Sequence, residues 1–152
     1  MNLRSLCKRV RWIVLPLIAW ALSFPYNALG DDPEEILIVA NRKCEQSTMT
    51  LNQARTFFLK QQSSWGKGKR VHPFNAKRGT EIRRAFQQRV LGMDSAMEET
   101  YWQEMQIKKG ITPPPEFSNT LKAVFSVESS IGYIYRKDYK EGVVKVLLVL
   151  KK

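Results

Sequence analysis

The stretch HPFNAKRGTEIRRAF, residues 72–86, joins a short strand-like segment to a polar loop and then to a helical pattern. Four Lys and Arg side chains and one His surround a single glycine, Gly79. Beyond the loop, apolar residues recur at helical spacing from Ile82 to Val90, which predicts an amphipathic helix. A strand, a glycine-containing loop and a helix in this order favour an α/β domain.

Three interpretations of the loop follow from the residues alone. Lys77, Arg78, Gly79 and Thr80 lie where free backbone N–H groups at a helix start can hold an anion. The same residues also fit a basic turn that leads into a solvated helix face. A nucleic-acid patch is the third interpretation, and it depends on the compartment in which the chain resides.

The first 30 residues indicate that compartment. The segment MNLRSLCKRVRW carries four cations and no acid, and the apolar run IVLPLIAWALSF (13–24) follows it. The run is too short to span a bilayer as a helix and contains Pro16. A small-x-small pattern, Ala28-Leu29-Gly30, precedes the first acid. Residues 1–30 are therefore predicted to be a cleaved signal peptide, with a retained amphipathic anchor as the alternative.

Export changes which partners are plausible. Removing residues 1–30 from the 152-residue chain takes four of the 25 cations and none of the 14 acids, so the mature net charge is +7. An exported basic protein is expected to meet anionic solutes, membrane surfaces or acidic proteins rather than nucleic acid. The mature chain keeps only Cys44, which excludes an intramolecular disulfide; we expect a buried, inert thiol, with a reactive or intermolecular role as the alternative.

Strand and helix signals alternate along the rest of the chain. Apolar runs predict strands at ILIVA (36–40), IGYIY (131–135) and VVKVLLVL (143–150), and a short strand at RVHPFNA (70–76). Helical patterns lie between them, so residues 31–152 are predicted to form one α/β domain with a mixed sheet flanked by helices.

Capping patterns predict where the helices begin. Thr50 with Gln53 and Ser95 with Glu98 both fit a capping box, and Gly92 and Gly110 are expected to end helices. Ser118 or Asn119 is expected to cap a further short helix. The residues expected to face the core are Leu51, Ala54, Phe57, Phe58, Met97, Tyr101, Met105, Leu121, Val124 and Phe125. Those expected to face water are Arg83, Arg84, Gln87, Gln88, Glu98, Glu99 and Glu104.

Catalytic and metal chemistry find little support in the sequence. His72 is the only histidine, so a His- or thiolate-rich metal site cannot be assembled, and no nucleophile motif accompanies it. Neither dinucleotide nor P-loop fingerprints occur. We therefore expect no enzyme activity and no cofactor.

The order of these segments resembles that of a known family. The segment TLNQARTFFLKQQSSWGKGKRVHPFNAKRGTEIRRAF (50–86) resembles the part of phosphate-type ABC transporter substrate-binding proteins that ends in a Gly-Ser-Gly-Thr loop and a phenylalanine. YWQEMQIKKGITPPPEF (101–117) and SVESSIGYIY (126–135) are similar to that family's Tyr-Trp helix, Pro-Pro connector and Ile-Gly-Tyr strand. The resemblance implies one lobe of a type II periplasmic-binding-protein fold.

The resemblance also implies where the ligand would bind. With Phe86 as the reference, the family's Gly-Ser-Gly-Thr falls on Gly79, Thr80, Glu81 and Ile82, and its preceding arginine falls on Ala76. The candidate ligand-binding residues are thus Lys77, Arg78, Gly79, Thr80, Glu81 and Ile82. Because Glu81 replaces a glycine and Ile82 replaces a hydroxyl, we expect weak binding of phosphate or another oxyanion.

Three functions compete on this basis. The first is a periplasmic protein that captures phosphate or another oxyanion, as the resemblance implies. The second is a periplasmic interaction or sensory module that has lost tight phosphate binding and recognises a protein or a second copy of itself. The third, adhesion to an anionic membrane or envelope polymer, rests on the net charge alone.

Overall fold

The computed structural model describes residues 34–66 and 68–151. The predicted signal peptide, residues 1–30, lies outside these ranges. Within them, no helix combines the length and the apolar character that crossing a membrane requires.

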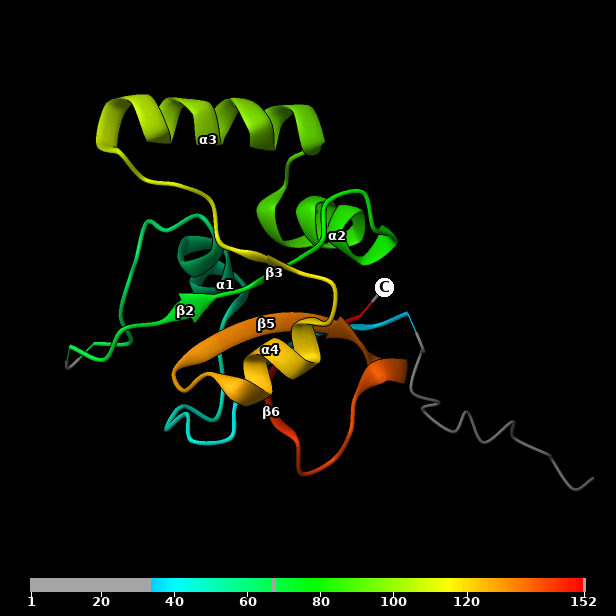
Figure 1. Cartoon of the computed structure of the whole chain (residues 1–152). Helices are drawn as coiled ribbons and strands as arrows, with labels where there is room; N and C mark the ends of the chain where they lie inside the picture. The colour runs from blue at the N-terminus through cyan, green and yellow to red at the C-terminus, as the bar shows by residue number, and fades with distance from the viewer. Residues whose placement is uncertain (1–33, 67, 152) are drawn as a thin grey trace, which may run out of the picture. The chain divides into compact units, whose positions relative to one another are not determined.

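A four-stranded mixed sheet forms the centre of the domain (Figure 1). Its order is β2 (His72–Pro73), β5 (Ser130–Tyr135), β1 (Ile36–Asn41) and β6 (Val144–Leu150). β1 is antiparallel to both β5 and β6, and β2 is parallel to β5. A separate two-stranded parallel pair joins β3 (Asn75–Ala76) to β4 (Glu116–Phe117). The predicted strands are confirmed.

Helices cover both faces of the sheet, as predicted. Every residue of β1 is buried, because Ile36 and Ile38 enter one core while Leu37 and Val39 enter another. The first core includes side chains from α1 (Leu51–Phe58) and α2 (Glu81–Phe86), and the second includes Val124 from α4 (Thr120–Ser126). Burial on both faces explains why β1 is apolar throughout instead of alternating.

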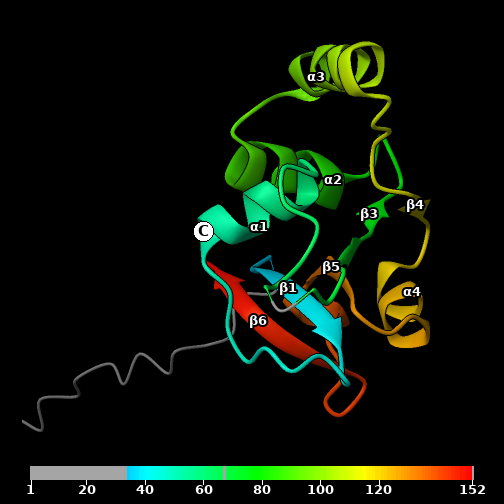
Figure 2. The same cartoon turned by 90° about the vertical axis from the view of Figure 1, so that its left-hand side faces the viewer.

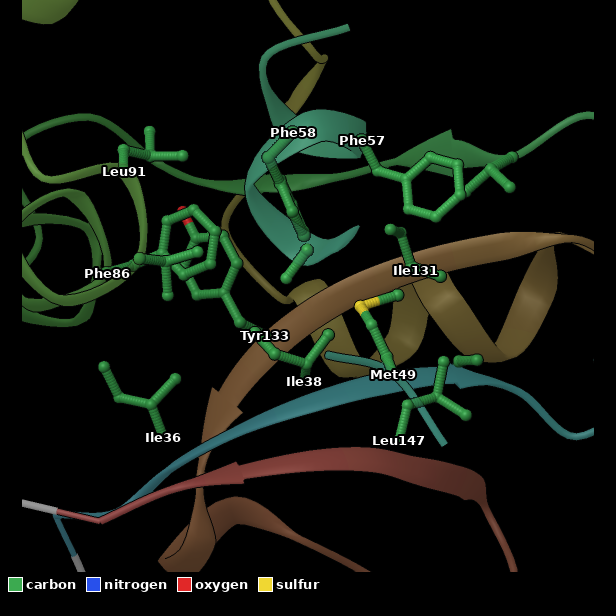
Figure 3. Close-up of a cluster of buried hydrophobic side chains, with 14 of the residues drawn as sticks. Ile36, Ile38, Met49, Phe57, Phe58, Phe86, Leu91, Ile131, Tyr133 and Leu147 are labelled. Atoms are coloured by element: carbon green, nitrogen blue, oxygen red, sulfur yellow. The ribbon is translucent and has the colours of Figure 1, made fainter. Parts of the chain in front are cut away.

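Aromatic rings fill the larger core (Figure 3). Phe86 and Tyr133 stack with ring centroids 3.8 Å apart, and the Phe58 ring meets both of them edge-on. Phe57 meets Trp65 in the same way, so Trp65 contributes to packing. These contacts connect α1 and α2 to β5.

Helix α1 begins as the sequence predicts. Thr50 Oγ1 accepts from the Gln53 backbone N–H at 3.1 Å, and the Gln53 side chain accepts from the Thr50 N–H at 2.9 Å. The sequence pattern predicts an end near Lys60 to Gln62, and the helix ends slightly earlier, at Phe58. Of its four predicted core residues three are buried, whereas Leu51 is exposed.

The next helical segment has two parts. α2 continues without a break into a single π-helical stretch, η1 (Gln87–Leu91), which Gly92 ends in the left-handed conformation that glycine favours, φ 67°. The prediction that Gly92 stops the helix is therefore confirmed.

Two predictions about α3 (Ser95–Lys109) are wrong. Its cap is Asp94, whose carboxylate accepts from the Met97 N–H at 2.8 Å, and Ser95 instead donates to the Gln87 side chain. The inward face is centred on Glu98 and Trp102, so Met97 is 57% exposed. Gly110 ends the helix as predicted. α3 lies beyond α2, away from the sheet, in both views (Figures 1 and 2).

Helix α4 packs closely on β5. Asn119 caps it, as predicted, by accepting from the Lys122 N–H at 2.9 Å. Gly132 permits the close approach, because a Cβ atom there would lie 2.6 Å from Thr120 and 2.7 Å from Val124. Phe125, predicted to face the core, is 55% exposed. The short 3₁₀ segment η2 (Arg136–Asp138) follows β5.

Candidate functional site

The predicted loop, residues 77–82, leaves the end of β3 and enters α2. Gly79 adopts a φ of 83°, which explains a glycine at this position, and nothing lies within 4 Å of where its Cβ would be. Thr80 Oγ1 donates to the Lys77 carbonyl at 2.7 Å and makes no capping hydrogen bond to α2. The hydroxyl therefore stabilises the turn rather than the helix start.

Arg78 is turned away from the helix start. Its backbone N–H donates to Glu116 Oε2 at 3.0 Å, and its guanidinium Nε lies 3.7 Å from Glu116 Oε1. β4 thus provides a carboxylate partner for Arg78. Glu81 is exposed as the first residue of α2.

A hollow of about 450 Å³ lies beside the loop. β2 runs parallel to β5, and β3 follows β2 directly, so the loop and the segment after β5 emerge at the same end of these strands. In open α/β sheets, ligands bind at the carboxyl ends of the strands. The hollow has that position.

Three segments line the hollow. Lys77, Thr80 and Ile82 come from the predicted loop, so three of the six predicted residues line it and Arg78, Gly79 and Glu81 do not. The residues between Ser118 and Leu121 line it from the start of α4. The segment after β5 contributes Lys137, Asp138, Tyr139 and Lys140.

The hollow gathers positive charge from separate parts of the chain. Lys77, Lys137 and Lys140 all line it, against one carboxylate, Asp138. Among the described residues none of these lysines makes an ion pair, although Lys137 Nζ lies 5.1 Å from the Tyr135 ring centroid. Hydroxyls of Thr80, Ser118 and Thr120 add neutral hydrogen-bonding groups. The arrangement suits a small anion.

Sequence reasoning missed the lysines that follow β5. The signal was the cation-rich run RKDYK, residues 136–140, directly after the predicted strand IGYIY. Its proximity to Lys77 depends on β2 pairing with β5, which no local pattern specifies. Only the strand order shows that the run 136–140 and the loop with Lys77 lie beside the same hollow.

A buried polar cluster lies behind the loop and corrects three predictions. Arg83, Gln87 and Glu98, all expected to face water, are buried, with Arg83 2% and Glu98 4% exposed. Arg83 donates to Glu98, as do the Gln87 side chain and the Trp102 indole N–H. Glu98 is fully engaged as an ion-pair acceptor and is not a free general acid.

Tyr133 connects this cluster to the strands. Its hydroxyl accepts from Arg83 at 3.1 Å and from the Ala76 N–H at 3.0 Å, and it donates to Asn75 Oδ1 at 3.4 Å. Burial raises the pKa of Tyr133, while the adjacent Arg83 charge acts in the opposite direction. The cluster fixes β3, α2, β5 and α3 relative to one another and so positions the loop.

Several solved structures that share this fold are described as phosphate-transport or phosphate-binding proteins. An ABC-type phosphate transport receptor from Vibrio cholerae matches with a TM-score of 0.57 and 14% identity, over 74% of this chain and 44% of the receptor. PstS from Borrelia burgdorferi matches with a TM-score of 0.56 and 13% identity, over 74% of this chain and 46% of PstS. A phosphate-bound protein of this transporter class from Clostridium perfringens matches with a TM-score of 0.56 and 19% identity, over 74% of this chain and 43% of that protein.

The fold is a periplasmic-binding-protein fold. This confirms both the predicted fold class and the resemblance to phosphate ABC transporter substrate-binding proteins at the level of fold. The chain spans less than half the length of each of the three structures. No protein-family model matches the sequence, and no curated protein matches it either.

Proposed function

We propose that this chain is an exported, single-lobe binding protein that holds phosphate or another small oxyanion weakly in the hollow at the carboxyl ends of β3 and β5. The observation that carries the proposal is the convergence of Lys77, Lys137 and Lys140 on one hollow. The fold supports it, because a structural neighbour from Clostridium perfringens carries bound phosphate.

The lysines replace the chemistry that the loop has lost. Ala76, where the family's arginine would fall, is buried in β3, and Arg78 is paired with Glu116. α2 is only six residues long, so its dipole is a minor contribution. Lysine ammonium groups bind phosphate as point charges without the bidentate geometry of arginine. Affinity is then governed by charge and falls as salt rises.

Weak affinity follows from exposure to solvent. Lys77, Lys137 and Lys140 are all exposed, so an oxyanion that they hold keeps a hydrated side. Charge-assisted hydrogen bonds are weaker where water is not excluded. We expect a dissociation constant of about 1 mM for phosphate, which corresponds to roughly −4 kcal/mol.

Isothermal titration calorimetry with phosphate at fixed ionic strength tests the proposal. Lys137→Ala combined with Lys140→Ala should weaken binding about tenfold, since each removes a charge from the hollow. Glu81→Gly should strengthen binding, because it removes a negative charge beside the loop, whereas Arg78→Ala should have a small effect.

The matched control is Lys43→Ala combined with Lys69→Ala, which also removes two cations but from lysines that are paired with Glu128 and Glu45 outside the hollow. The proposal is wrong if this control weakens phosphate binding as much as the hollow variant does. Submicromolar binding by the unmodified chain would contradict the solvated geometry.

The proposal includes export to the periplasm, with residues 1–30 removed and residues 31–152 forming the single lobe. Its support is the charged, apolar and small-residue pattern of the first 30 residues. N-terminal sequencing of the protein recovered from the periplasmic fraction should begin near Asp31. Recovery of a chain that starts at Met1 in the membrane fraction would overturn this part.

A further inference from the structure

Helix α3 is attached to the rest of the domain by its first half. Its buried residues are Glu98 and Trp102, and Tyr101 adds a hydrogen bond from its hydroxyl to the Leu59 carbonyl at 2.8 Å. From Gln103 to Lys109 every residue is exposed except Met105, which is half-buried. The outer face and the whole second half of α3 are therefore free to meet another surface.

That outer face carries apolar side chains. Met97 is 57% exposed and Ile107 is 85% exposed, and both lie on the side away from Glu98 and Trp102. A shallow depression of about 490 Å³ lies along the first half of the face, between Met93 and Glu104. Met93, Ala96, Met97 and Tyr101 all line this depression, so apolar side chains are contiguous there, and contiguous apolar patches mark interaction surfaces.

The charges along α3 identify what kind of partner fits. Asp94, Glu99 and Glu104 lie at its start and middle, whereas Lys108 and Lys109 lie at its end. Because Glu98 is buried against Arg83, the exposed acids and bases of α3 balance, Glu99 and Glu104 against Lys108 and Lys109, and Lys108 pairs with Glu104 within the helix. The other helices of the described chain carry more bases than acids. The rest of this strongly basic chain repels a second copy, and α3 is where that repulsion is absent.

We propose that α3 is a self-association surface, on which two copies of this chain pair through antiparallel α3 helices. A two-fold axis level with Trp102 brings Ile107 of one copy level with Met97 of the other, and the neighbouring Ala96, whose side chain is small, leaves room for both. The same axis brings Lys108 and Lys109 of one copy to the acidic start of the second copy's helix. An isologous interface requires this self-complementarity.

The pairing is expected to be weak. One helix from each copy buries less surface than a standard interface does, so we expect a dissociation constant of about 100 µM. It leaves the lysine-lined hollow uncovered by α3, since none of the residues that line the hollow belongs to this helix. The proposal therefore does not depend on oxyanion binding.

Sedimentation equilibrium across a concentration series tests the surface. Met97→Lys places a positive charge beside Lys108 of the second copy. Ile107→Glu places a negative charge beside the acidic start of that copy's helix. Each should weaken the dimer at least tenfold. The matched control is Phe125→Lys, which changes a comparably exposed apolar residue, 55% exposed, on α4.

Three results would overturn the proposal. They are a chain that stays monomeric up to about 1 mM, a dimer that Met97→Lys and Ile107→Glu leave unchanged, and a dimer that Phe125→Lys weakens equally. Circular dichroism of each variant confirms that it is folded, so that loss of the dimer is not loss of the fold.

Cross-linking tests the orientation. In a Cys44→Ala background, chains carrying Thr100→Cys are mixed with chains carrying Glu104→Cys and oxidised. Antiparallel helices centred on Trp102 bring position 100 of one copy level with position 104 of the other, so mixed dimers should predominate. Predominance of like-with-like dimers would indicate parallel helices and overturn the antiparallel arrangement.

Discussion

Helices α1 and α3 both begin at a residue whose side chain caps the first turn, yet they are held in place by opposite means. α1 inserts Ala54, Phe57 and Phe58 into the larger core. α3 is nearly twice as long, and its buried residues are an ion-paired carboxylate, Glu98, and Trp102.

The difference shows two ways to attach a helix. Apolar burial is non-directional and roughly proportional to area, so α1 tolerates small shifts while remaining attached. A buried ion pair costs desolvation and is favourable only when its partners are correctly placed. α3 is thus positioned precisely but attached over a small area, which leaves its outer face free.

The largest expected effect comes from breaking the ion pair. Glu98→Ala leaves the Arg83 guanidinium buried without its counter-charge, which should cost about 3–5 kcal/mol of unfolding free energy. Denaturant unfolding measures this cost. Hydrogen exchange should show greater loss of protection in α3 than in α1.

A double variant separates charge burial from packing. Arg83→Met together with Glu98→Met replaces the pair by apolar side chains and should recover most of the loss. If the double variant is as unstable as Glu98→Ala, the pair is not what holds α3. Equal loss of exchange protection in both helices would remove the distinction drawn between them.

A smaller effect is expected at the two caps. Thr50→Ala and Asp94→Ala each remove a hydrogen bond to a first-turn N–H and should cost about 0.5–2 kcal/mol. Ser95→Ala is the control: Ser95 does not cap α3, and its bond to Gln87 is long at 3.2 Å, so about 0.5 kcal/mol or less is expected. The denaturation midpoints of the three variants measure these costs. If Ser95→Ala lowered the midpoint and Asp94→Ala left it unchanged, Ser95 rather than Asp94 would be the cap of α3.

The smallest effect concerns alkaline pH. Burial raises the pKa of Tyr133 above its ordinary value of 10.0, so the unfolded chain loses this proton first as the pH rises. The resulting stability is fully present below about pH 10 and is lost as the pH rises through the folded-state pKa.

Unfolding free energies measured from pH 8 to pH 11 should therefore decline less steeply in Tyr133→Phe than in the unmodified chain. Part of the decline in unfolding free energy should remain in Tyr133→Phe, because burial also raises the pKa of Tyr135. Lys60 acts in the opposite direction, because burial lowers its pKa. Identical pH profiles for the two chains would show that Tyr133 is not titrated differently in the folded state.

Local signals explain which parts of the fold could be predicted. β1, β6 and α1 followed from apolar runs and a capping box, each complete within a few residues. α3 was rotated in the prediction, because Met97, Tyr101 and Met105 also fit an apolar stripe. A carboxylate in a helix is normally assigned to solvent, and only the distant Arg83 makes the burial of Glu98 favourable.

The candidate site was half predictable for a related reason. Lys77 and Thr80 belong to a contiguous loop with a recognisable order of residues. Lys137 and Lys140 reach the same hollow from some 60 positions further along the chain, through the pairing of β2 with β5. Arg78 does not line the hollow, and local sequence could not reveal this, because its partner Glu116 is brought to it by the pairing of β3 with β4.

The position of β1 in the sheet also determines when the domain can fold. β1 comes first among the described strands, but its two neighbours are the last two, β5 and β6. During synthesis at about 5–20 residues per second, residues 36–41 wait on the order of ten seconds for residue 150. Long-range pairings of this kind also fold slowly once the chain is complete. For that interval the most apolar strand of the domain, Ile36–Asn41, has no partner, and an unpaired apolar strand of this kind is prone to aggregate.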